Sequence, residues 1–425
     1  MVQIFPEACY ELYPIQTSVA LVLAQVCAPW RSLALSMPVL WASFSLKIAQ
    51  LSLAGFGDQN LRCRKFISSL LQLHLDRSNG HPLTFDIDFN KAEISPAALA
   101  LVDTLIDHSE RWMRVKIPFS AVFLPLYARL KRRLPRLESL DLRLEGMIGY
   151  NRDAMYLEDA PRLRRLALGS SKVYNLPFPK NQLTELHLGA AATLDMFQFM
   201  TRCPCPYLTT LILNPYYPLK LSTSQSLPPL IHLCTLVLAI RDGYSRNPII
   251  DVLDLLTTPS LQDLQIVGRH GFLLPRHTFA SFVTRSACRL VSLTITFKNN
   301  LPVPSLLDNL RTLSSLTHFA VFALGEEAMH SVRTILESLT ITSDQFVLPN
   351  LVSFELQTVR FHPALLDMVE SRFGSDPSCA KLHSLGYHNA PTTDVAVRRL
   401  RRFKAKGLTV TWLPSHKPSK SHLFI

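Results

Sequence analysis

The chain has 425 residues, of which 48% are hydrophobic and 18% are charged, and it carries a net charge of +12 at pH 7. This composition excludes a disordered chain, because disorder requires a low hydrophobic content and a high density of charge. The longest purely apolar stretch near the N-terminus, Val19 to Ala24, is far shorter than the roughly 20 residues of a membrane-spanning helix. We therefore expect no membrane partner.

The eight cysteines are dispersed along the chain and do not have the spacing of a disulfide framework. Cys203 and Cys205 form the only close pair, and no Cys-x-x-Cys or His-x-His stands near them to complete a zinc site. Dispersed free thiols are typical of a reducing compartment. The sequence therefore predicts a cytoplasmic or nuclear protein with no metal and no cofactor.

A Leu-x-x-Leu-x-Leu pattern, with conservative replacements, recurs through most of the chain. Its last three positions alternate as a short strand does, with apolar residues on one face. Successive copies are separated by 20 to 35 residues, close to the roughly 20–29 residues of a leucine-rich repeat. The copies start at residues 112, 137, 163, 183, 208, 233, 261, 290, 316, 351 and 382.

Amphipathic stretches of helix length lie between these strand patterns, and a proline precedes several strands by two residues, as at Pro135 and Pro161. Right-handed crossovers would place all strands on one layer and all helices on the other. We therefore predict an α/β fold, an irregular leucine-rich-repeat solenoid with parallel strands inside and helices outside. The expected helices are Pro96–His108, Thr193–Thr201, Ile249–Leu256, Thr278–Ser286, Ser305–Thr312, Glu326–Leu339, Pro363–Arg372 and Asp394–Lys406.

The asparagine of the leucine-rich-repeat consensus, which satisfies backbone groups of the turn after the strand, is absent. An irregular arc with repeats of variable length is the expected consequence, and the turns must be satisfied in another way. The equivalent positions are occupied by Glu145, Ser171, Ala191, Tyr216, Arg241 and Arg269.

Residues 19 to 46 do not follow the repeat pattern. Leu23, Val26, Cys27, Trp30 and Ala34 fall on one predicted helical stripe. A short turn at Pro38-Val-Leu-Trp41 follows. The segment reads Val26-Cys27-x-x-Trp30-Arg31-x-x-Ala34-x-x-x-Pro38-x-Leu40-Trp41.

This pattern resembles the second half of an F-box, a small helical domain that binds the Skp adaptor of cullin-type ubiquitin ligases. The remainder of the chain resembles the F-box/leucine-rich-repeat proteins of mushroom-forming fungi. That likeness rests on the segments Leu75–Phe85, His108–Val115 and Leu134–Leu140. An F-box opens with Leu-Pro-x-Glu-Ile/Leu-Leu, whereas this chain starts Met1-Val-Gln-Ile4-Phe5, so we expect a truncated first helix.

The resemblance implies a substrate-recognition subunit of a Skp–cullin–F-box ubiquitin ligase. Its partners would be a Skp-type adaptor, a cullin reached through that adaptor, and a protein target of unknown identity. The residues that the resemblance assigns to adaptor binding are Val26, Cys27, Trp30, Leu33, Leu40 and Trp41.

The expected organisation is a helical F-box-like segment over 1–46, a helical connector over 47–82, the solenoid over 83–413 and a disordered tail over 414–425. Gly407 to Trp412 should form a terminal strand. Target contacts are expected on the strand face, although the sequence does not rank them. Candidate positions beside the strand leucines are Glu138, Asp141, Arg143, Arg164, Arg165 and His187.

Two other interpretations stay open. Trp30 and Trp41 could pack in the core of a cap over the first repeats, which would make the chain a protein-interaction scaffold outside any ligase. In either case Trp30→Ala is expected to cost about 3–5 kcal/mol of stability. The basic residues around Lys131–Arg133, Arg162–Arg165 and Arg398–Lys406 could instead bind nucleic acid.

We favour solvated outer faces of helices for these basic residues, with Leu400 and Phe403 facing inward, because the aromatic residues that stack on single strands are not interleaved with them. No nucleotide-binding or hydrolase motif occurs in the chain. Asp86 and Asp88 alternate with Phe85, Ile87 and Phe89, as on an exposed strand face. The sequence therefore predicts a non-catalytic receptor or adaptor subunit without catalytic residues.

Overall fold

The computed structural model describes residues 19–47, 57–89, 96–144, 157–170, 174, 176–217, 227–240, 248–268, 274–341, 346–373, 379–389, 391 and 393–412. Contacts within the chain group it into a first unit, Met1–Glu185, and a second unit, Leu186–Ile425. Among the described helices, none has the length and the apolar character that crossing a bilayer requires.

From residue 19, where the described part of the first unit starts, three short helices are followed by strands that alternate with helices. Its strands β1 to β5 are parallel, and each pairs with the next one along the chain. The elements are α2 (Val19–Val26), α3 (Ala28–Ser36), α4 (Pro38–Trp41), β1 (Ser43–Lys47), α5 (Gly57–Arg77), β2 (Leu83–Asp88), α6 (Pro96–Asp107), β3 (Trp112–Phe119), α7 (Leu124–Tyr127), β4 (Ser139–Leu144) and β5 (Arg165–Ser170).

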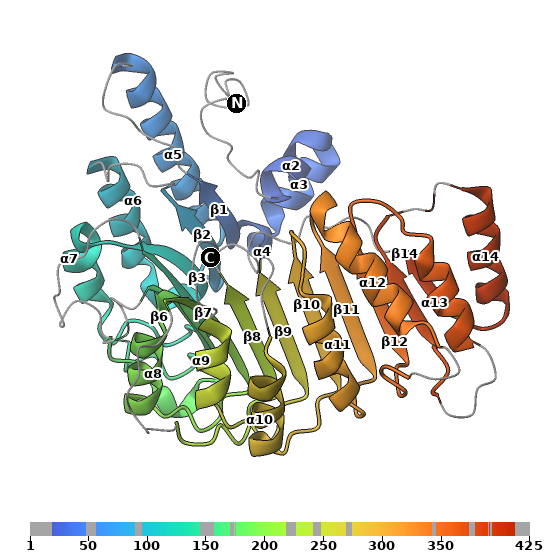
Figure 1. Cartoon of the computed structure of the whole chain (residues 1–425). Helices are drawn as coiled ribbons and strands as arrows, with labels where there is room; N and C mark the ends of the chain where they lie inside the picture. The colour runs from blue at the N-terminus through green and yellow to red at the C-terminus, as the bar shows by residue number, and fades with distance from the viewer. Residues whose placement is uncertain are drawn as a thin grey trace. The chain divides into compact units, whose positions relative to one another are not determined.

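The second unit repeats the same alternation. Strands β7 to β14 are parallel neighbours in chain order, and consecutive helices from α9 to α14 pack against one another along one face of the sheet (Figure 1). Strand β6 (Glu185–Ala192) begins at the last residue of the first unit. The other elements are α8 (Thr193–Arg202), β7 (Thr210–Tyr217), β8 (Thr235–Ile240), α9 (Pro248–Leu255), β9 (Asp263–Gly268), α10 (Arg276–Ser286), β10 (Ser292–Phe297), α11 (Val303–Thr312), β11 (His318–Ala323), α12 (Met329–Leu339), β12 (Ser353–Gln357), α13 (Ala364–Phe373), β13 (Ser384–Tyr387), α14 (Asp394–Ala405) and β14 (Thr409–Trp412).

The predicted fold class is confirmed, because parallel strands in chain order alternate with helices as in a leucine-rich-repeat solenoid. The leucines of the pattern form its core. In the second unit Leu211, Leu236, Leu264 and Leu293 are buried and lie opposite one another in register on four successive strands. Because parallel strands are about 4.8 Å apart, these rows of leucine form a continuous apolar core that no single repeat could bury alone.

The sheet starts earlier than the sequence patterns suggested. Strand β1 lies at Ser43–Lys47, across the expected boundary between the F-box-like segment and the connector, and pairs with β2. Phe44 and Leu46 are buried and alternate with serines, which is the period-two signal of a strand. Helix α5 fills most of the expected connector. The chain start at Ile4 and Phe5 and the tail 414–425 lie outside the described residues.

Serines of one repeat satisfy backbone donors of the repeat before it. The hydroxyl oxygens of Ser286, Ser331 and Ser371 accept hydrogen bonds from backbone N–H groups 28 to 30 residues earlier in the chain. These donors are Thr258 at 3.1 Å, Leu301 at 2.8 Å and Ile341 at 3.0 Å. The serines thus satisfy backbone groups between repeats, which is a function of the consensus asparagine that this chain lacks. The six asparagine-equivalent side chains lie outside the described part of the structure.

At the opposite end of the repeats, the residue just before a strand pattern donates to a carbonyl of the preceding repeat. Ser260 donates to Ile231 at 2.6 Å, and Ser315 donates to Leu290 at 2.7 Å. Asn350 makes the equivalent bond through its amide. Both ends of successive repeats are therefore joined by side chains, which satisfies backbone groups that stacking would otherwise leave unpaired.

Arg372 of α13 joins repeats through a fully buried guanidinium. It donates to the carbonyl oxygens of Leu339 at 2.7 Å, Leu348 at 3.0 Å and Val347. Leu339 is the last residue of α12, whose final carbonyls have no partner within the helix. Burial lowers the pKa of Arg372 to about 10, so the group stays charged at pH 7.

We expect Arg372→Leu to lower the free energy of unfolding by about 2–4 kcal/mol, because it removes the donor to the carbonyl oxygens of Leu339 and Val347, whereas the carbonyl of Leu348 still accepts from the backbone N–H of Leu351. Urea unfolding measures this loss. Arg401→Leu, on the exposed face of α14, removes the same charge and is expected to leave the unfolding midpoint unchanged. Equal effects of the two substitutions would contradict the role assigned to Arg372.

Candidate protein-interaction surfaces

The N-terminal helices carry an unusual concentration of exposed apolar side chains. Among the described residues, sixteen large apolar side chains are exposed, and eight of them lie between residues 19 and 39. They are grouped on consecutive helices, and large exposed apolar patches mark interaction sites more often than scattered exposed residues do. We call these residues the N-terminal apolar face: Val19, Val22, Val26, Trp30, Leu33, Leu35, Met37 and Val39.

A helix break shapes this face. The sequence stripe suggested one continuous helix, but the backbone at Cys27 is extended, with φ −160° and ψ 172°, and it separates α2 from α3. A proline in the first turn of α3, Pro29, favours a new helix start at that point. The two helices pack together as a hairpin, with Ala20 and Ala34 buried. Leu21 and Leu23 are half-buried, and the residues of the N-terminal apolar face are left exposed.

The six residues expected to bind the adaptor are divided by the structure. Val26 is 59% exposed, Trp30 50% and Leu33 57%, and Cys27 is also exposed. Leu40 is half-buried on α4. Four of the six therefore lie on the surface of α2 and α3 or between them.

Trp41 is buried in the core, so its side chain has no exposed surface with which to contact an adaptor. Its side chain is 1% exposed, and its indole N–H donates to the carbonyl oxygen of Ala34 at 2.8 Å. The expectation for Trp30 also changes, because a half-exposed side chain cannot cost as much on truncation as a buried one. The two tryptophans thus have different roles, one as an anchor and one at the surface.

His74 of α5 completes the anchor of the N-terminal helices. Its Nδ1 lies 2.9 Å from the carbonyl oxygen of Trp41, and its ring centroid is 5.3 Å from that of Trp41 and 5.1 Å from that of Phe44. Because a carbonyl only accepts, Nδ1 carries the proton. Burial lowers the pKa of His74, so the neutral ring is favoured.

Aromatic contacts continue from this anchor into the sheet. Phe44 of β1 stacks on Phe85 of β2 with centroids 5.6 Å apart, and the rings of Phe85 and Trp112 of β3 form a T-shaped contact with centroids 5.4 Å apart. The helices that carry the N-terminal apolar face are therefore packed onto the first strands.

A second candidate surface is the face of β2–β5 that points away from the strand leucines. Lys116 lies in register between Asp86 and Asp141, on the two neighbouring strands. Arg143 reaches across Pro118 to both carboxylate oxygens of Asp86, at 2.8 and 3.2 Å. The predicted strand with Asp86 and Asp88 on one face is confirmed, but both carboxylates are only partly exposed.

Asp141 also belongs to this charged network, with a carboxylate oxygen 3.7 Å from Arg143. Burial raises its pKa, and the cations Arg143 and Lys116 oppose that shift. Among the other positions proposed for target contacts, Glu138 lies 3.9 Å from Arg114, and Arg164 donates to the carbonyl oxygen of Gln182 at 3.4 Å. His187 lies on β6, in the second unit.

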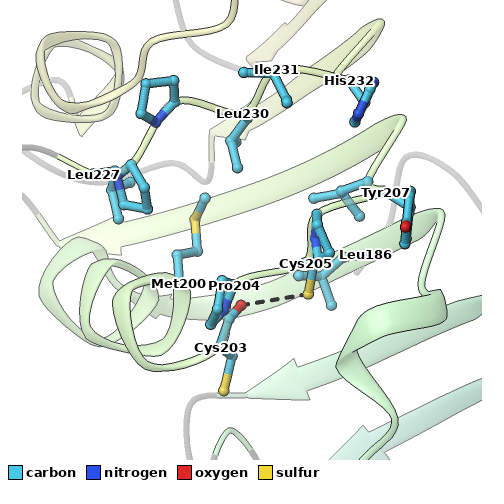
Figure 2. Close-up of a pocket in the computed structure, with 14 residues that line it drawn as sticks. Leu186, Met200, Cys203, Pro204, Cys205, Tyr207, Leu227, Leu230, Ile231 and His232 are labelled. Carbon is cyan, nitrogen blue, oxygen red and sulfur yellow. Dashed lines mark hydrogen bonds between the residues drawn. The ribbon is translucent and has the colours of Figure 1, made fainter.

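A pocket in the second unit was not anticipated from the sequence. It has a volume of about 380 Å³ and lies between the segment that precedes β7 and the segment that precedes β8 (Figure 2). The rings of Tyr207 and His232 stack at its rim with centroids 6.3 Å apart. None of its lining residues is an aspartate, glutamate, lysine or arginine, and Figure 2 shows the thiol of Cys205 donating to the carbonyl oxygen of Cys203 at 3.5 Å.

The C-terminal basic run forms the outer face of α14. Leu400 and Phe403 are buried as predicted, whereas Arg398, Arg401 and Arg402 are exposed. Arg399 of the same helix pairs with Asp367 at 2.9 Å and with Glu370 of α13. In the described part of the chain, no group of three His, Cys, Asp or Glu residues is placed to hold a metal ion.

In comparisons with known proteins, no protein family and no curated protein matches this sequence.

We expect Trp41→Ala to destabilise the chain by about 3–5 kcal/mol, because it removes a fully buried indole and a hydrogen bond to the helix hairpin. Trp30→Ala should cost at most about 2 kcal/mol, since half of that side chain already faces solvent. Chemical denaturation of the two variants measures the difference. A Trp30→Ala loss as large as that of Trp41→Ala would show that Trp30 is also buried.

The lowered pKa of His74 predicts a loss of stability in mild acid. Below about pH 6.5 the unfolded chain binds a proton at this histidine, whereas the folded chain stays unprotonated to lower pH. The free energy of unfolding therefore decreases as the pH is lowered through this range. His108 and His362 have lowered pKa values too and add to the same slope. Urea midpoints between neutral and mildly acidic pH should therefore fall less steeply in His74→Gln than in the wild type. An unchanged slope would contradict the buried, neutral state of His74.

Proposed function

We propose that this chain is a non-catalytic substrate receptor of a Skp–cullin–F-box ubiquitin ligase, with the N-terminal apolar face bound to a Skp-type adaptor. The observation that carries the proposal is the clustering of half of all exposed large apolar side chains of the described residues on α2, α3 and the start of α4. Burying such a face against a partner is favourable, at roughly 25 cal/mol for each Å² of apolar surface removed from water.

The anchoring of the face supports binding to a folded partner. Trp41, His74 and Phe44 hold α4 against α5 and β1, and the indole of Trp41 fixes α4 to the end of α3. A surface that is already ordered loses less conformational entropy on binding than a flexible segment does. The resemblance of residues 26–41 to the second half of an F-box then points to the adaptor as the partner.

The solenoid would supply the target-binding part of the receptor. Its strand face presents side chains from successive repeats at regular spacing, an arrangement that repeat proteins commonly use to bind partners. In this proposal the chain contributes positioning, since it would hold a target near the ubiquitin-charged enzyme while other subunits carry out the chemistry. The cullin would be reached only through the adaptor.

The alternative is a protein-interaction scaffold that uses the same apolar face for a partner outside any ligase. A nucleic-acid-binding solenoid is less well supported. The exposed cations of α14 could contact phosphates, but Arg399 of that helix is already paired with carboxylates, and the helix exposes no aromatic side chain for base stacking.

Co-expression with a Skp-type adaptor, followed by size-exclusion chromatography, tests the proposal. The wild-type chain is expected to elute with the adaptor. A variant with Trp30→Asp and Leu33→Asp should lose the complex, because it places two charges in the centre of the apolar contact while leaving the core intact. Val395→Asp is the matched control, since Val395 is equally exposed on α14, and it should keep the complex.

Absence of a complex with the wild-type chain, while circular dichroism shows it folded, would overturn the ligase proposal and leave the scaffold as the better account. Loss of the complex in Val395→Asp as well would mean that the adaptor does not recognise the N-terminal apolar face.

A further inference from the structure

The last strand of the second unit has one free edge. Strand β14 pairs with β13 along one side, in a register that runs from Ser384 opposite Thr409 to Tyr387 opposite Trp412. Among the described strands, none pairs with its other side. Helix α14 closes the row of helices at the same end of the unit (Figure 1). Because an unpaired strand edge is a template for pairing with another chain, this end of the second unit is a candidate docking surface.

The hydrogen bonds of β14 identify which backbone groups are free. The N–H of Thr409 donates to the carbonyl oxygen of His383 at 2.9 Å, so Thr409 directs its backbone groups to β13. Successive residues of a strand direct their N–H and C=O groups to opposite sides. The backbone groups of Val410 and Trp412 therefore point to the open edge, with a donor and an acceptor at each position.

The turn before β14 and a contact after it hold the strand in place. Gly407 ends α14 with φ 97°, a conformation that favours glycine, and the N–H of Leu408 donates to the carbonyl oxygen of Phe403 at 3.1 Å. The indole N–H of Trp412 donates to the carbonyl oxygen of His388 at 3.2 Å, while 59% of Trp412 stays exposed. An edge that is already ordered loses little conformational entropy when a strand is added to it.

Cations of α14 lie beside the open edge. Carboxylates of α13 bind Arg399, and the 3.6 residues of a helical turn place Arg401 about 200° and Lys404 about 140° further around the helix, on the side away from α13. Both side chains are exposed, and within the described residues no carboxylate lies within ion-pair distance of either. The only acidic residue of α14 is Asp394, at its first position. The surface beside the open edge is therefore positively charged.

We propose that the open edge of β14, together with Arg401 and Lys404, binds an extended acidic segment of a partner protein, which adds to the sheet as one more strand. Backbone hydrogen bonds to Val410 and Trp412 hold the segment. Every second side chain of a strand lies on the same face, so carboxylates at alternate positions of the segment meet the cations of α14 together. The site does not involve the N-terminal apolar face, so it is a binding function beyond that of the adaptor proposal.

Charge and hydrogen-bonding chemistry separate this partner from other occupants of the edge. A second copy of the chain would bring its own Arg401 and Lys404 to the edge, where like charges repel. The chain's own residues 414–425 contain two lysines and no acidic residue. A nucleic acid presents phosphate oxygens, which only accept hydrogen bonds and would repel the carbonyl oxygens of the edge. An acidic peptide supplies backbone donors, backbone acceptors and carboxylates at once.

Fluorescence anisotropy of the full chain with labelled peptides tests the proposal. The probe is a short peptide of alternating valine and glutamate. It is compared with the same peptide carrying glutamine in place of glutamate and with the glutamate peptide N-methylated along its backbone. The unmodified acidic peptide is expected to bind at least about fivefold more tightly than the N-methylated one, because methylation removes the donors to the open edge. It should also bind more tightly than the glutamine peptide.

Substitutions at the cations locate the contact on the chain. Arg401→Gln combined with Lys404→Gln should weaken binding of the acidic peptide roughly three- to tenfold, since two exposed ion pairs are lost. The matched control is Arg276→Gln combined with Lys298→Gln, which removes the same charge from exposed positions elsewhere in the second unit and should bind as the wild type does. In hydrogen–deuterium exchange, the peptide should slow exchange in residues 408–412 of the wild-type chain.

Equal losses in the two double variants would overturn the proposal and indicate attraction by net charge alone. Equal binding of the N-methylated and unmodified peptides would contradict strand addition. Dimerisation of the chain through residues 408–412 would assign the edge to a second copy and overturn the proposal too. So would binding of single-stranded DNA that depends on Arg401 and Lys404 while the acidic peptide does not bind. Neither double variant changes the N-terminal apolar face, so the adaptor experiment has a separate outcome.

Discussion

The structure depends on one constraint: the apolar face of each strand can be buried only by the repeats on either side of it. Stacking solves the burial problem, since rows such as Leu211, Leu236, Leu264 and Leu293 form a continuous core. It creates a second problem, because every turn then brings backbone donors and acceptors into the space between repeats. Helical serines, residues just before the strands, and the buried guanidinium of Arg372 supply the missing partners. Each repeat is thus stable only as part of the row.

The same constraint explains the N-terminal helices. The first strand of a stacked row needs cover, and α4 supplies it through Trp41, which is held by Ala34 and His74 while Phe44 continues the contact into the sheet. Small residues, Ala20 and Ala34, are buried in the α2–α3 hairpin, and the residues of the N-terminal apolar face are left exposed. The exposed apolar side chains of these helices are therefore available for a partner.

Leucine spacing was sufficient to predict the strands, because burial on one face imposes a period of two that survives variable repeat lengths. It could not separate Trp30 from Trp41. Both match the same motif, and the break at Cys27 that turns one outward depends on how α2 and α3 pack. The pocket beside Tyr207 and His232 has no sequence signature, because its walls come from turns with unrelated sequences.

The central claim is that the N-terminal apolar face is a binding surface and not part of the core. Hydrogen–deuterium exchange of the full chain, with and without a Skp-type adaptor, tests this most directly, because it locates the contact without substitutions. The account predicts that addition of the adaptor slows exchange in residues 19–41 and leaves the helices of the second unit unchanged. Unchanged exchange in residues 19–41, or protection confined to α14, would contradict it.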